Sequence, residues 1–208
     1  MRDDFLTAAR SAADLLRDPA VAAAWSQPSA LPEFSVGGLA AHLAYQVTAL
    51  PDMFAAPEPS EPTIPVLEHY ARAAWVGAEL DADINVRIRE GGEATAAQGP
   101  EALVAQLDAA VEQLAEVLPT MANRPVRLSL WGPWSLLVDD YLLTRMMELT
   151  VHSDDLAVSV SVPTPELPPT VTEPVIALLT ALSVRRNGPT AVLRALSRAE
   201  RATGITAF

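Results

Sequence analysis

The sequence predicts an all-α protein, a helix bundle, from its composition and from the spacing of its apolar residues. Half of the 208 residues are hydrophobic and 19% are charged, which is typical of one globular domain. Aromatic residues make up only 5%, and alanine, leucine and valine dominate. Because sandwiches and barrels are enriched in aromatic and β-branched residues, this balance favours packed helices. Apolar residues at helical spacing then locate the individual helices.

The first helix is expected within residues 3 to 25. Its apolar residues recur at helical spacing, and Asp3 and Asp4 suit the positive N-terminal end of a helix. Pro19 is expected to bend or divide this helix, because proline removes a backbone donor and clashes with the preceding turn.

A second helix is predicted over residues 36 to 50, with Ser35 as its N-cap and Pro51 as its end. Residues 51 to 65 contain five prolines among small and acidic residues. We therefore expect them to form an extended connection across the surface.

A third helix is predicted from residue 66 to about residue 90, with a break at Gly91 and Gly92. Pro100, which suits the first position of a helix, opens a fourth segment that continues to about residue 118.

The alternating segment VRLSLW, between Pro119 and Pro133, predicts a loop or a small hairpin. Residues 136 to 160 have the strongest helical pattern of the chain. Two further helices are predicted near residues 170 to 186 and 189 to 202. Leucines at helical spacing in this last part predict that it packs on the bundle.

The charge of the chain and its lack of lysine and cysteine exclude several classes of function. A formal charge of −12 would repel a phosphate backbone, so nucleic acid is not expected as a partner. All fourteen basic residues are arginines and there is no cysteine, so lysine Schiff bases, protein thiolates and sulfur ligands are excluded. Any thiol chemistry must use an external thiol.

The expected location is the cytoplasm. The first ten residues carry two acidic groups where a signal peptide would be basic, and no apolar run approaches the roughly 18 residues of a membrane span. No membrane partner is therefore expected, and the sequence leaves a homodimer open.

Five polar residues of the helix predicted over residues 136 to 160 share one face. At 100° per residue they lie within an arc of about 80°. Two of them, Glu148 and His152, are one turn apart, which allows a carboxylate and an imidazole to reach a common metal ion. Such pairs also arise as ordinary helix-surface contacts. The five residues of this face are Tyr141, Arg145, Glu148, His152 and Asp155.

A third ligand would have to be His42 or His69. His42 lies in an apolar helix, where a buried imidazole needs a partner. It is either a core histidine bonded to a backbone carbonyl or a ligand, and Gly37 and Gly38 one turn earlier would allow another helix to approach closely. His69 fits a partly exposed helix and a structural or pocket-lining role.

The segments SVGGLAAHLAYQ and RMMELTVHSDDLA together resemble the DinB-like superfamily, in particular the N-terminal domain of mycothiol-dependent maleylpyruvate isomerases. The resemblance covers roughly residues 1 to 160. It implies a four-helix bundle in which His42, Glu148 and His152 hold one zinc-type ion. Residues 161 to 208 would then be a C-terminal helical extension packed on the same domain.

The resemblance also matches Arg145 and Asp155 to an arginine and an aspartate of the family pattern, which makes them the candidate catalytic residues. Asp155 would orient a ligating imidazole or accept a proton, because metal-bound histidines donate their other nitrogen to a carboxylate or carbonyl. A surface pair between Arg145 and Asp155 is the alternative. Trp131 and Trp134 could roof an apolar pocket or anchor a loop.

Two imidazoles and one carboxylate leave part of the coordination shell of zinc open, as in catalytic sites. Zinc is the expected metal, with nickel or iron as alternatives. The resemblance implies mycothiol or a similar small thiol that attacks an electrophilic small molecule, in an S-transfer or an isomerisation. Arg185 and Arg186 could meet an anionic substrate, although exposure to solvent is the simpler expectation.

One departure from the family pattern and two alternative hypotheses bear on this function. The isomerases carry a further C-terminal domain that contributes to activity, whereas about 50 residues follow Asp155 here, so maleylpyruvate isomerisation itself is the less supported reaction. A metal-binding module without turnover, a sensor or partner-binding bundle, is the second hypothesis. A bundle without metal, whose histidines are satisfied by internal hydrogen bonds, is the third.

Overall fold

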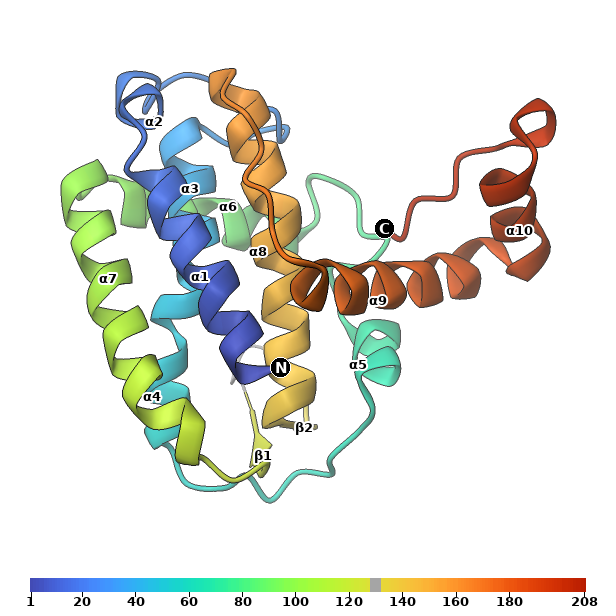
Figure 1. Ribbon diagram of the computed structural model, residues 1–208, viewed down its shortest axis with the longest axis horizontal. Coiled ribbons are helices and arrows are strands. Elements are labelled where there is room, and N and C mark those ends of the chain that lie inside the picture. The colour runs from blue at the N-terminus through green and yellow to red at the C-terminus, as the bar shows by residue number, and fades with distance from the viewer. Residues whose placement is uncertain (128–131) are drawn as a thin grey trace.

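The body of the molecule is formed by helices α1 (Arg2–Leu16), α3 (Val36–Thr48), α7 (Pro100–Val117) and α8 (Val138–Val160), which run side by side (Figure 1). The computed structural model describes residues 1–127 and 132–208. The only strands in these residues are two short ones, so the all-α prediction is confirmed.

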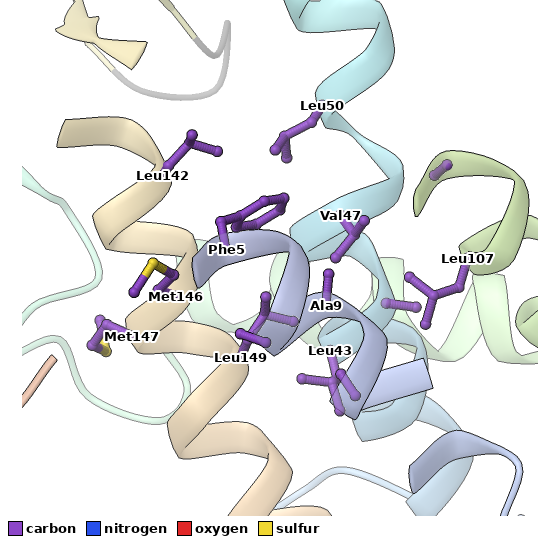
Figure 2. Packing of buried hydrophobic residues seen from close by; sticks show 14 of the residues in the cluster. Phe5, Ala9, Leu43, Val47, Leu50, Leu107, Leu142, Met146, Met147 and Leu149 are labelled. Carbon is purple, nitrogen blue, oxygen red and sulfur yellow. The ribbon is translucent and has the colours of Figure 1, made fainter. Parts of the chain in front are cut away.

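Side chains from all four helices meet in one hydrophobic core (Figure 2). Phe5 of α1 is fully buried and lies between α3 and α8, while Leu107 of α7 closes the opposite side. Burying large side chains of this kind contributes roughly 1.5–3 kcal/mol each. The labelled core residues are Phe5, Ala9, Leu43, Val47, Leu50, Leu107, Leu142, Met146, Met147 and Leu149.

The caps of the first helices follow the predicted pattern, with one correction. Pro19 divides the first helical segment, because α2 (Pro19–Ala23) starts anew with Asp18 as its cap. Ser35 caps α3 as predicted, since its hydroxyl accepts a hydrogen bond from the Gly38 amide at 2.9 Å. Helix α3 ends at Thr48, two residues before the predicted end, but Pro51 is not what ends it. Pro51 lies in the first turn of α4 (Leu50–Ala55), where a proline needs no amide partner.

The prediction for the third helix is also corrected. It is two helices, α5 (Val66–Arg72) and α6 (Asp83–Ala96), and Gly92 lies inside α6 instead of breaking it. A Cβ atom on Gly92 would lie 2.7 Å from the Gly38 carbonyl oxygen. These glycines therefore let α6 pack directly against α3.

The segment before α8 forms a small antiparallel ribbon. Strands β1 (Pro125–Val126) and β2 (Leu136–Leu137) pair with Val126 opposite Leu136. The predicted segment VRLSLW lies partly outside the described residues. A short 3-10 helix, η1 (Leu118–Thr120), links α7 to this ribbon.

The last part of the chain leaves the bundle (Figure 1). Helix α9 (Pro169–Asn187) contacts α8, α1 and α5, whereas α10 (Pro189–Ser197) contacts α9 and η2 (Ala199–Arg201). Leu193 and Leu196 of α10 are exposed. The division of the chain at residue 160 stays a prediction. Within the described residues, none of the helices is both long enough and apolar enough to cross a bilayer.

Candidate functional site

The polar face predicted for α8 is present and lines up along the helix. Glu148 and His152 face each other, with 3.1 Å between Oε2 and Nε2. The other ring nitrogen of His152, Nδ1, lies 2.9 Å from Oδ2 of Asp155. One turn before Glu148, the Arg145 guanidinium lies 5.2 Å from the centre of the Tyr141 ring. The imidazole of His152 is therefore held between two carboxylates.

His42 of α3 joins this face from across the bundle. Its ring centre lies 4.9 Å from that of His152, and candidate donor atoms of His42, Glu148 and His152 all lie within 4.8 Å of one another. Two donors about 2.1 Å from a shared zinc ion are at most about 4.2 Å apart. Small side-chain rotations would therefore let the three residues share a divalent ion, and two imidazoles with one carboxylate are ligands that zinc accepts.

The charges of the three side chains are strongly coupled. Burial acts to lower the pKa of His152, but its hydrogen bonds to Asp155 and Glu148 raise it to about 9. Burial acts to raise the pKa of Glu148, but His152 and Arg145 lower it to about 2. Burial lowers the pKa of His42 to about 4, and the neighbouring His152 acts in the same direction. At neutral pH, His42 is therefore a neutral imidazole and Glu148 a carboxylate, whereas His152 would have to release a proton when a metal ion binds.

Gln46 connects the two helices of this site, and sequence reasoning missed it. Its side-chain amide nitrogen donates to the His42 carbonyl oxygen at 2.9 Å, and its amide oxygen accepts a short hydrogen bond from Arg145. Arg145 also donates to the Thr144 hydroxyl at 3.0 Å. The signal was its position, one turn after His42 and on the same helix face. Arg145 is thus buried and joined to α3, which differs from the alternative of a surface pair with Asp155.

His69 is more buried than the sequence indicated. Only 2% of it is exposed, because Trp134 covers it and donates from Nε1 to Nδ1 of His69 at 3.1 Å. Burial lowers the pKa of His69 to about 4. Both residues line the main cavity, which agrees with the pocket-lining alternative given for each. Trp131 lies outside the described residues.

A cavity of about 840 Å³ opens beside His42, Glu148 and His152, and all three line it. Arg145 and Gln46 belong to the same wall. The rest of the lining is mostly apolar, and much of it comes from the chain before α3, from the segment after α5 and from α6. A small molecule in this cavity would reach the candidate metal ligands directly.

A smaller cavity of about 330 Å³ adjoins the segment after α5. Arg185 and Arg186 line it. Both are exposed to solvent, as the sequence analysis expected. Tyr70 also lines it, and its hydroxyl is the one buried side-chain polar atom in the described part of the chain without a hydrogen-bond partner. Burial raises the pKa of this hydroxyl.

Residues 5–157 match the sequence model of the mycothiol maleylpyruvate isomerase N-terminal domain. The chain belongs to this family. The two segments that carried the resemblance, around His42 and around Glu148 and His152, both lie within the matched residues.

Two solved structures support the same assignment of fold. A crystal structure of the mycothiol-dependent maleylpyruvate isomerase superposes with a TM-score of 0.55 and 19% identity, over 88% of this chain and 70% of that chain. A histidine-to-alanine mutant of the mycothiol-dependent maleylpyruvate isomerase gives 0.54 and 18% over the same shares. At these identities the likeness concerns the fold alone, the DinB-like bundle. Comparison with functionally curated proteins gives no match.

Proposed function

We propose that this member of the mycothiol maleylpyruvate isomerase N-terminal domain family is a metal-dependent enzyme that uses a small thiol of the mycothiol type. It would act on a small electrophilic molecule, by isomerisation or by S-transfer. The observation that carries the proposal is the convergence of His42, Glu148 and His152 on the wall of an 840 Å³ cavity. A metal-binding module that only ties two helices together would not need this space.

His42, Glu148 and His152 would hold the ion, with zinc as the first expectation. A divalent ion held by these residues would supply Lewis acidity, which would lower the pKa of an incoming thiol and favour its thiolate near neutral pH. Asp155 would fix the ring of His152, because its carboxylate lies 2.9 Å from Nδ1 and leaves Nε2 to face Glu148.

The thiol must come from outside, because the chain has no cysteine. The names of the family and of the similar structures indicate mycothiol and an isomerisation. Arg145 lines the cavity close to Glu148, so its positive charge would favour an anionic group formed there during the reaction. Gln46 would hold Arg145 in that position through its amide oxygen.

The test follows the consumption of mycothiol by the untagged, zinc-loaded protein against a panel of small electrophiles, with maleylpyruvate among them. The parent protein should accelerate consumption with at least one of them. His42→Ala and His152→Ala should reduce this rate to the uncatalysed level while circular dichroism shows that they remain folded. Equal rates for the parent and both folded variants would exclude metal-dependent thiol transfer at this site. Zinc binding without any turnover would favour the non-catalytic module.

A further inference from the structure

We propose that the main cavity binds an electrophile with a bulky, uncharged apolar group, and that the Phe208 side chain limits the length of that group. This inference rests on the proposed function and names the substrate class of the same site. It concerns the end of the cavity that is lined by α6 and by Trp75 and Phe208.

The lining of this end is mostly apolar, with Asn85 and Arg89 as its polar residues on α6. Ile84 and Ile88 lie one turn apart on α6, and both line the cavity, together with Leu80 from the preceding loop. Trp75 comes from the segment after α5. Because each buried methylene of a ligand gains free energy by leaving water, such a wall selects alkyl or aromatic groups.

The arginines of the cavity wall already have partners. Arg72 forms an ion pair with Glu68 and lies 5.7 Å from the centre of the Trp134 ring. Arg89 donates to the Leu80 carbonyl oxygen at 2.7 Å, and Arg145 donates to Gln46. These contacts engage only some of the guanidinium donors. The preference for an uncharged group at the α6 end therefore rests on the isoleucine and tryptophan side chains of the wall, beside which an anion would lose its water without a partner.

Phe208 lines both cavities, as does Ala73. The ring centre of Phe208 lies 4.9 Å from that of Trp75 and 5.8 Å from that of Tyr70. An apolar group that grows along the main cavity would therefore meet this ring cluster. Removing the Phe208 ring would join the 840 Å³ cavity to the 330 Å³ cavity.

Helix α9 holds Phe208 in place through the residues before it. The Ser183 hydroxyl donates to the Ile205 carbonyl oxygen at 2.6 Å, and the Asn187 side chain donates to the Thr206 carbonyl oxygen at 2.9 Å. These two hydrogen bonds bring residues 205 to 208 back from α10 to the cavity (Figure 1). Helix α9 thus contributes to the site indirectly, because it holds the segment that places Phe208 in the cavity wall.

The test measures binding alone, so that its result does not depend on metal or thiol. The fluorescent, uncharged probe N-phenyl-1-naphthylamine is bound to the full chain and displaced by straight-chain alcohols from butanol to dodecanol. Alkanesulfonates of equal length are the charged comparison. We expect alcohol affinity to rise about fourfold per methylene and then level off at a limiting length. Sulfonates should bind more weakly by a factor of about ten or more.

Phe208→Ala should move the limiting length to longer alcohols, and Phe208→Val should move it less. The matched control is Leu193→Ala, which truncates a side chain that is 67% exposed on α10 and should leave the limit unchanged. Equal binding of sulfonates and alcohols would overturn the inference, as would an unchanged limit in the folded Phe208 variants. A loss of thiol consumption with an intact alcohol series would count against the proposed function alone.

Discussion

His152 and His69 line the same cavity but have opposite surroundings. His152 lies between two carboxylates, and its hydrogen bonds raise its pKa to about 9 against the effect of burial. His69 faces Trp134, which donates to it, and burial lowers its pKa to about 4. This contrast indicates which imidazole suits a cation. His152 has acceptors on both sides, whereas one nitrogen of His69 is already engaged by a donor.

The largest expected effect is on zinc affinity, and it should distinguish the replacement of His152 from the replacement of His69. His152→Ala should lower zinc affinity by more than about a hundredfold, beyond the range typical of residues that only support a ligand. His69→Gln should leave zinc affinity within a small factor of the parent, because Gln can still accept from Trp134. Metal content and competitive zinc titration of untagged protein measure both. A zinc site lost in His69→Gln and kept in His152→Ala would reverse the assignment.

The free energy of unfolding should depend on pH in acid because His69 is buried. Its pKa is about 4 in the folded protein, against an ordinary value of 6.5 for a histidine exposed to water. The unfolded chain therefore binds the proton first, and stability is lost as the pH falls from 6.5 toward 4. This loss should reach about 3 kcal/mol, and it should be absent above pH 6.5. Urea unfolding across this range should give a shallower pH dependence for His69→Gln. Parallel curves would contradict the prediction.

Asp155 provides a smaller and more selective change at His152. Asp155→Asn should keep all three candidate ligands and lower zinc affinity by about 10- to 100-fold, because the amide supports the imidazole less well. Asp154→Asn is the matched control, since Asp154 is exposed and accepts from Thr164 instead. Zinc titration of both variants measures the effect. Equal affinities for the two variants would remove Asp155 from the site.

The smallest effect concerns the neighbour of His69. The Tyr70 hydroxyl is buried and has no hydrogen-bond partner among residues 1–127 and 132–208, so Tyr70→Phe should raise the free energy of unfolding by about 1 kcal/mol. Tyr45→Phe, at a residue that is 39% exposed, should change it less. Thermal and urea unfolding test this. A marked loss of stability in Tyr70→Phe would mean that the hydroxyl has a partner after all.

The sequence predicted most of the helices because their caps and periodicity are local. Ser35 and Pro100 mark helix starts that the structure has, and the face from Tyr141 to Asp155 needed only the helical repeat. Pro51 and Gly92 misled, because their roles depend on neighbours that are distant in sequence: Pro51 starts a new helix, and Gly92 fits against α3.

The site was predictable only in part for the same reason. His42, Glu148 and His152 could be named from two segments and a resemblance, although their roles as ligands stay a prediction. Gln46 has a recognisable position on α3, but its bond to Arg145 spans 99 residues of sequence. Nothing local indicates that Phe208 lines the cavity, because the return of the chain depends on Ser183 and Asn187.

The contact between Gly38 and Gly92 has a consequence for how this cavity can change. The side chains of Ile84 and Ile88 reach the cavity from α6. Helix α6 lies close to α3 because the two residues at their contact are glycines, which have no side chain. An added methyl group at residue 92 would push α6 outward and carry that whole wall with it. Selection for bulkier substrates could therefore act on a position that touches none of them.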